Sequence, residues 1–136
     1  MGVSLKVGTV AFEIGTPAFL YSFFSTVCVR LEEGKWGSYF PTIMKDFYSG
    51  KILNSQASQA LKELEQIRSL LSQLPPEQVV WDFEKRDLQP PWGNKISSQI
   101  TSLENYFVTS NGKNLLDVFT NAIELSHRTK KDVQVA

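Results

Sequence analysis

Apolar side chains in the first quarter of the chain follow a strand pattern and then a helix pattern. From Leu5 to Ile14 the residues are β-prone and place apolar side chains on both faces, which predicts one strand inside a sheet. Gly15 ends this strand, and Thr16-Pro17 then supplies a helix N-cap and a proline at the first helical position. We therefore expect a helix that continues to about Leu31 and ends before Gly34.

Three later segments also show the helical period. A short helix is predicted from Pro41 to Tyr48, and a last amphipathic helix spans roughly Leu115 to His127. The clearest helix runs from about Ser55 to Gln73. Charged residues occupy its solvated face, and the last two of them are spaced to form an ion pair: Lys62, Glu63, Glu65 and Arg68.

Two segments in the second half of the chain show strand patterns. Apolar and mostly acidic positions alternate from Val79 to Glu84, which predicts a half-buried strand with one apolar and one carboxylate face. Tyr106 to Val108 suggests another strand, followed by a tight turn. The tail from Lys131 to Ala136 either forms an edge strand or frays.

Together these elements predict a single α+β domain over residues 1–136. Its antiparallel or mixed β-sheet is expected to contain the first strand, the Val79 to Glu84 strand and the Tyr106 region, covered by three to four helices. The length of 136 residues and the hydrophobic content of 42% suit one buried core.

Charge and cysteine usage narrow the classes of partner. Fourteen basic residues balance fourteen acidic ones, so no net field attracts nucleic acid or a membrane, and we expect neither as a direct partner. The most apolar run, Ala18 to Val29, is shorter than the ~20 residues of a membrane span. Cys28 is the only cysteine and the amino terminus lacks a signal-peptide pattern, which favours a cytoplasmic location.

Few residues are candidates for catalysis. The only histidine, His127, sits near a helix end, where a cation complements the helix dipole, and Cys28 lies among phenylalanines as a small buried hydrophobe. Asp82 and Glu84 project from one face of the predicted strand as a solvated face, an acidic contact patch for a basic partner, or an acid–base pair. We expect no catalytic residue, no metal site and no cofactor.

Two tryptophans sit in glycine-bounded turns rather than on a periodic face. Trp36 lies between Gly34 and Gly37, and Trp92 lies between two prolines and Gly93-Asn94. Each ring either folds back to close the core or stays exposed as a binding hot spot. The candidate partner-binding residues are therefore Trp92, Asp82, Glu84, Asn94 and Trp36.

Six short segments, taken in order along nearly the whole chain, carry a resemblance to a known family, and the tryptophan turns are the most specific of them. They are Lys6-Val7-Gly8-Thr9, Phe12-Glu13-Ile14-Gly15, the Leu31 to Gly37 turn, Val79-Val80-Trp81-Asp82, Pro90-Pro91-Trp92-Gly93 and Tyr106-Phe107-Val108-Thr109. In these segments the chain resembles immunity protein family seventy of bacterial polymorphic toxin systems.

The resemblance implies a small bacterial cytoplasmic protein that binds a toxin domain delivered by neighbouring cells and neutralises it stoichiometrically, by occluding or distorting the active site. Such toxins are often nucleases, and their inhibitors often present acidic surfaces. We expect Trp92 to anchor the toxin and the Asp82-Glu84 face to guide it. Two rival hypotheses are an enzyme that uses Asp82, Glu84 or Glu13, and a regulatory module with a housekeeping partner. A neutral chain indicates no particular oligomeric state.

Overall fold

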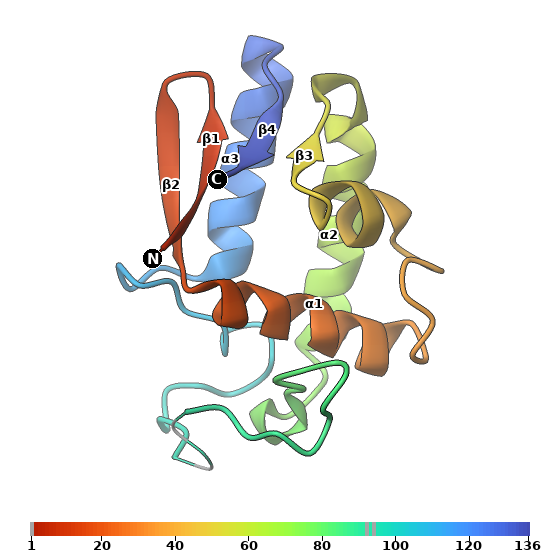
Figure 1. Cartoon of the computed structure of the whole chain (residues 1–136), viewed down its shortest axis with the longest axis vertical. Coiled ribbons are helices and arrows are strands. Elements are labelled where there is room, and N and C mark those ends of the chain that lie inside the picture. Colours follow the sequence, from red (N-terminus) through yellow and green to blue (C-terminus); the bar gives the residue numbers. More distant parts are fainter. Residues whose placement is uncertain (1, 92, 94) are drawn as a thin grey trace.

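The computed structural model describes residues 2–91, 93 and 95–136, which form an α+β domain, as predicted (Figure 1). Four strands form one antiparallel sheet in the order β2-β1-β4-β3. The strands are β1 (Val3–Val7), β2 (Val10–Gly15), β3 (Lys51–Ile52) and β4 (Val133–Val135). The α-helices are α1 (Pro17–Leu31), α2 (Ala57–Leu71) and α3 (Leu115–Thr129). Three short helical turns are η1 (Thr42–Phe47, a π-helix), η2 (Asn54–Gln56) and η3 (Pro76–Gln78).

The single strand predicted from Leu5 to Ile14 is wrong, because the chain reverses in its middle and forms the β1–β2 hairpin. Gly8 has a φ of +61° and opens a two-residue turn, a conformation that glycine adopts without a steric cost. Val7 therefore pairs with Val10 across the turn, and Leu5 pairs with Phe12. Apolar residues that the sequence pattern places on opposite faces of one strand therefore lie on the same face of two paired strands.

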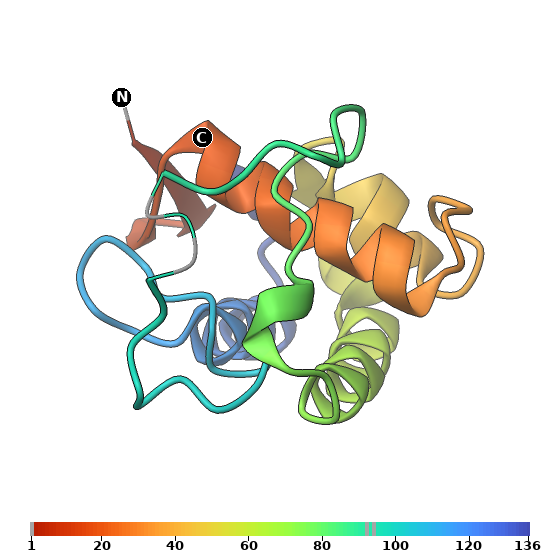
Figure 2. The same ribbon diagram turned by 90° about the horizontal axis from the view of Figure 1, so that it is seen from below.

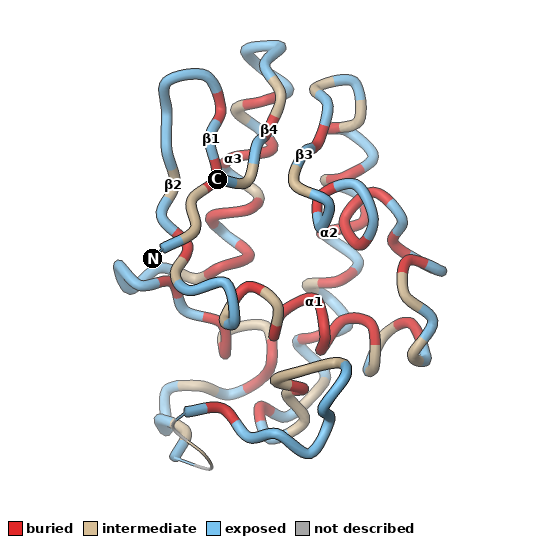
Figure 3. The backbone as a smooth tube through the Cα atoms, in the orientation of Figure 1, coloured by how far each residue is buried: buried red, intermediate tan, exposed pale blue. Residues whose placement is uncertain are grey.

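The sheet is apolar on one face only. Leu5 and Val7 of β1 and Val133 of β4 are buried toward the helices, and α3 lies behind the sheet in Figure 1. The opposite face carries a row of exposed residues that crosses all four strands in register: Ala11, Lys6, Gln134 and Lys51. Figure 3 shows exposed residues in pale blue alternating with buried and intermediate ones along the strands. The tail, for which the sequence allows either an edge strand or a frayed end, forms β4. This strand lies inside the sheet, between β1 and β3.

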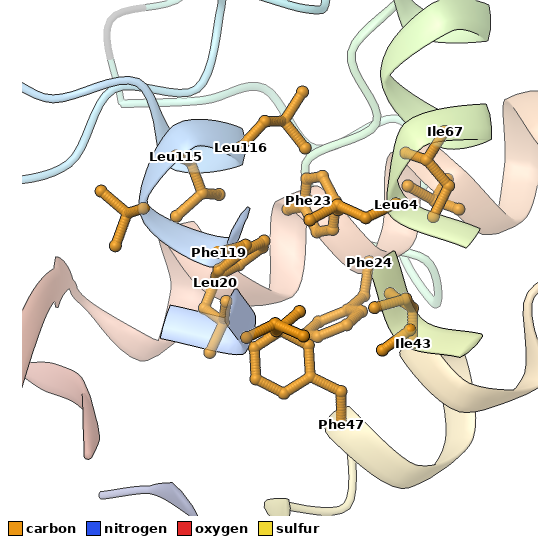
Figure 4. Close-up of a cluster of buried hydrophobic side chains, with 14 of the residues drawn as sticks. Leu20, Phe23, Phe24, Ile43, Phe47, Leu64, Ile67, Leu115, Leu116 and Phe119 are labelled. Atoms are coloured by element: carbon orange, nitrogen blue, oxygen red, sulfur yellow. The ribbon is translucent and has the colours of Figure 1, made fainter. Parts of the chain in front are cut away.

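The helices follow the predicted signals closely. Thr16 caps α1 by accepting a hydrogen bond from the Phe19 N–H at 3.1 Å, and Pro17 occupies the first helical position. Asn114 caps α3 in the same way. Helices α1, α2, α3 and η1 together enclose the core shown in Figure 4, where Phe23 packs edge-on against Phe119 with ring centroids 5.3 Å apart.

Neither strand predicted in the second half of the chain is part of the sheet. Segment 79–83 crosses α1, as Figure 2 shows from below, and bonds to side chains of that helix. The Thr26 hydroxyl accepts from the Val80 N–H at 3.0 Å, and the Ser25 hydroxyl accepts from the Phe83 N–H at 3.0 Å. Buried hydroxyls on α1 thus satisfy backbone groups that a neighbouring strand would otherwise have to satisfy.

The Tyr106 region is likewise not a strand, because the start of α3 and the turn before it satisfy its backbone. The Phe107 carbonyl accepts from the Leu115 N–H at 2.9 Å, and Val108 forms an isolated bridge with Asn114.

Two details of the helix predicted from Ser55 to Gln73 also differ in α2. Arg68 forms ion pairs with Glu104 and Asp117 instead of Glu65, and Glu63 is buried instead of solvated. None of the helices described is long and apolar enough to cross a membrane.

Candidate partner-binding groove

Four segments that are distant in sequence meet around a groove of ≈ 360 Å³ next to α1, which we call the aromatic groove. They are α1, the turn after it, η1 with the residues that follow, and segment 79–84. Two residues predicted to bind a partner, Trp36 and Glu84, are both in its lining. The full lining is Tyr21, Trp36, Met44, Lys45, Tyr48, Ser49, Phe83 and Glu84.

A buried carboxylate builds the turn that carries Trp36. Glu32, at the end of α1, is 0% exposed and accepts three backbone hydrogen bonds. They come from the N–H groups of Gly37 at 2.9 Å, Tyr39 at 3.0 Å and Phe40 at 3.0 Å. Because all three donors belong to one loop, the carboxylate fixes the path of that loop over the end of α1.

A second buried carboxylate holds the start of η1. Glu63 of α2 accepts from the N–H groups of Thr42 at 3.3 Å and Ile43 at 3.0 Å, and the side chain of Gln59 donates to it at 3.1 Å. These backbone donors have no partner within η1, so Glu63 satisfies them from a neighbouring helix. Segment 32–47, which supplies three of the eight lining residues of the aromatic groove, is therefore attached to both α1 and α2.

Trp36 folds back against η1 and still lines the aromatic groove. Its indole Nε1–H donates to the Met44 carbonyl at 2.6 Å. Its ring meets the rings of Tyr48 and Phe83 nearly edge-on, with centroid distances of 4.8 Å and 5.3 Å. The side chain is half-buried, and Tyr48 keeps 46% of its surface exposed. The ring therefore folds back onto the loop and η1, which is one of the two alternatives expected for it, and it also forms part of the groove lining.

Asp82 and Glu84 do not project from one face of a strand. The Asp82 carboxylate accepts from the N–H groups of Glu84 at 2.9 Å and Lys85 at 3.1 Å, which closes a turn. That turn leaves Glu84 exposed at the margin of the aromatic groove. Burial raises the pKa of the Tyr21 hydroxyl, and the nearby charges of Glu84 and Asp82 raise the pKa further. Both carboxylates are therefore close enough to act on Tyr21, which lines the groove.

A second hollow of ≈ 440 Å³, which we call the apolar lobe, adjoins the aromatic groove through Tyr21 and Tyr48. It lies between α1, η1 and the strands β1 and β4. Its lining has no acidic or basic residue and consists of Val3, Pro17, Leu20, Tyr21, Phe24, Phe47, Tyr48 and Val135.

Cys28 and His127 are not part of the lining of the aromatic groove. Trp92 and Asn94 fall outside the described residues. Cys28 is buried, and burial followed by the charge of Glu32 raises the pKa of its thiol to about 11, so it is protonated at neutral pH. His127 is exposed in the last turn of α3. Within the part of the chain that the structure describes, no three acidic, histidine or cysteine side chains gather as a metal site.

Several residues of the groove and its frame were not candidates from the sequence, among them Tyr21, Tyr48 and Glu32. Tyr21 is the one tyrosine in a phenylalanine-rich helix, and its polar tip marks the edge of the buried stripe. Tyr48 ends the short helical segment next to Gly50, where a large ring has few local contacts to cover it. Glu32 carried no such signal, because its three bonds depend on how the following loop folds.

The fold and the groove define a small α+β protein with an aromatic surface hollow whose surrounding loop is hydrogen-bonded to two buried carboxylates. Comparison with known protein families shows that the chain belongs to the family described as Immunity protein 70, whose profile matches residues 5–135. Immunity proteins of toxin systems are generally non-catalytic, and membership implies a toxin protein as the partner. No curated protein and no solved structure matches the chain.

Proposed function

We propose that this protein binds a cognate toxin domain in the bacterial cytoplasm, neutralises it without catalysis, and contacts it through the aromatic groove. The observation that supports this proposal most directly is the pairing of Trp36 and Tyr48 at an open hollow. Tryptophan and tyrosine dominate binding hot spots because each buries a large area at a low cost in side-chain entropy.

The frame of the groove also favours binding. Glu32 and Glu63 fix segment 32–47 through backbone bonds, so a partner would meet a surface that is already ordered. The carboxylates of Asp82 and Glu84 suit a basic toxin surface, such as the active-site cleft of a nuclease. We include Trp92 and Asn94 in the proposed contact on the strength of the sequence alone.

The rival enzyme hypothesis has less support. Of the three carboxylates that it requires, Glu13 and Glu84 are exposed and Asp82 is half-buried. Asp82 is engaged in its turn, and Glu13 accepts from the Ser110 hydroxyl at 2.8 Å. A general acid or base is usually buried in a cleft, and none of these three carboxylates is fully buried.

The proposal is tested with the toxin domain encoded beside this protein. The two are co-expressed and co-purified, and the dissociation constant is compared between the unmodified chain and Tyr48→Ala. We expect Tyr48→Ala to weaken binding by about tenfold or more and to reduce protection of cells that express the toxin.

Tyr39→Ala is the matched control, because Tyr39 is 55% exposed, lies outside the groove lining and is held through its backbone N–H. It should leave the affinity within about twofold of the unmodified chain. The proposed function is rejected if no complex forms with the neighbouring toxin. The proposed surface is rejected if both variants bind equally well in folded form.

A further inference from the structure

We infer that the aromatic groove receives one arginine side chain of the toxin, with its guanidinium against the rings of Trp36 and Tyr48 and paired with Glu84. This inference rests on the proposed function and names the chemistry of the partner residue.

The rings offer several faces to a cation within a small space. Tyr21 lies 6.3 Å from both Trp36 and Tyr48, measured between ring centroids, and Trp36 lies 4.8 Å from Tyr48. The face of an aromatic ring is electronegative, and indole attracts cations most strongly. A flat guanidinium can therefore lie on one ring and present its N–H edge to another group.

Glu84 is the one acidic residue in the lining of the aromatic groove, and it offers a countercharge to a cationic side chain. Lys45 also lines the groove, but it does not pair with Glu84. No cation among the described residues lies within ion-pair distance of the Glu84 carboxylate. The alkyl chain of Lys45 packs closely over Gly37, where an added Cβ would come within 2.5 Å of the Lys45 Cε. Glu84 is thus free to pair with a cation from outside.

The chain itself supplies a precedent for a guanidinium on this cluster. The Cζ of Arg86 lies 5.0 Å from the centroid of the Phe83 ring, and Phe83 is part of the groove lining. Arginine is better suited than lysine, because guanidinium is planar, stacks on rings and pairs bidentately with a carboxylate. Ammonium binds water more strongly and gains less from the rings.

The aromatic groove and the apolar lobe adjoin, and their linings indicate which of the two receives the charged guanidinium. The lining of the apolar lobe has no acidic or basic residue, whereas the lining of the aromatic groove includes Glu84. A charged head placed in the apolar lobe would lose water without gaining a countercharge. The arginine therefore belongs on the Trp36 side.

The first test uses small probes and needs no toxin. The isotope-labelled protein is titrated with acetyl-Gly-Arg-Gly-amide, and the same peptide with citrulline serves as the uncharged isostere. We expect saturable shifts of the Trp36 indole N–H and the Tyr48 and Ser49 amide signals with the arginine peptide. The citrulline peptide should bind at least about threefold more weakly, as loss of a cation–π contact implies.

Matched variants make the titration specific. Glu84→Gln should weaken the arginine peptide by about two- to fivefold, and Glu124→Gln, an exposed change on α3, should not. The inference is overturned if the citrulline peptide binds equally well, if the two variants behave alike, or if the shifts map elsewhere on the surface. A glutamate peptide that binds better than arginine would equally overturn it.

The second test locates the arginine in the complex. Each arginine of the toxin domain is replaced by alanine and combined with Glu84→Gln in a double-mutant cycle. One arginine should show a coupling of about fivefold or more in the dissociation constant. If the complex forms and depends on Tyr48 but no arginine couples, this inference fails while the proposed function stands. If no complex forms yet the arginine peptide binds, the proposed function fails, and the toxin is ruled out as the source of the arginine.

Discussion

The Glu32 carboxylate is predicted to be the strongest single determinant of the loop that carries Trp36. Its Oε1 accepts one backbone N–H, from Gly37, and its Oε2 accepts two, from Tyr39 and Phe40. In Glu32→Gln, one oxygen becomes an amide group that cannot accept a hydrogen bond. The least costly placement keeps the carbonyl oxygen at the position with two donors and loses the bond to Gly37.

The expected losses follow from the number of bonds broken. Hydrogen bonds to charged groups contribute about 1.5–3 kcal/mol each, so Glu32→Gln should lower the free energy of unfolding by about 2 kcal/mol. Glu32→Ala removes all three bonds and leaves buried donors unsatisfied, and we expect a loss of about 4 kcal/mol after the loop relaxes. That is a large part of the roughly 5–15 kcal/mol that stabilises a typical domain.

Urea unfolding followed by circular dichroism measures these losses, and Glu33→Gln is the matched control. Glu33 is the exposed neighbour, so its substitution should change the free energy of unfolding by less than about 0.5 kcal/mol. Hydrogen exchange adds a local readout, since the Gly37 amide should exchange faster in Glu32→Gln. Equal stability of Glu32→Gln and Glu33→Gln, or of Glu32→Gln and Glu32→Ala, would refute the bond-by-bond reasoning.

Two further predictions concern groups whose pKa values shift. Because burial raises the Cys28 pKa to about 11, its reaction with a thiol reagent at pH 8 should be about 100-fold slower in the folded protein than in urea; equal rates would contradict this. Hydrogen bonds from the Asn54 backbone and side chain lower the pKa of the Asp132 carboxyl. The ionised carboxylate therefore stabilises the fold above its unfolded pKa of about 4, and this contribution is lost as the pH falls below that value. Asp132→Asn should therefore lower the urea midpoint most at neutral pH and least near pH 3, and a difference that is independent of pH would contradict the assignment.

The fold class and the three long helices could be predicted because their signals are local. The Thr16-Pro17 start of α1 and the apolar stripe of α2 lie within one or two helical turns of the residues that they organise. The sheet could not be predicted in the same way. The alternation from Val79 to Glu84 is typical of a strand, yet buried hydroxyls on α1 bond the backbone of that segment.

The candidate site could likewise be predicted only in part from the sequence. Trp36 and Glu84 were selected from the sequence because of their turns and charge, and the structure brings both into one groove. Glu63 was assigned to the solvated face of its helix, because a carboxylate at that spacing is ordinarily exposed. Its partners, the N–H groups of Thr42 and Ile43, are about twenty residues away, and only the packing of η1 on α2 makes the burial favourable.

The inner position of β4 has a consequence for how the protein assembles. Leu5 pairs with Val135, so the middle of the sheet joins residues that are separated by almost the whole chain, whereas the β1–β2 hairpin closes over a two-residue turn. Pairings at long sequence separation form late and slowly, because the loop-closure entropy precedes any gain. Val3 and Val135, from β1 and β4, both line the apolar lobe. Two of the eight residues that line this lobe therefore come together only when the two ends of the chain have paired.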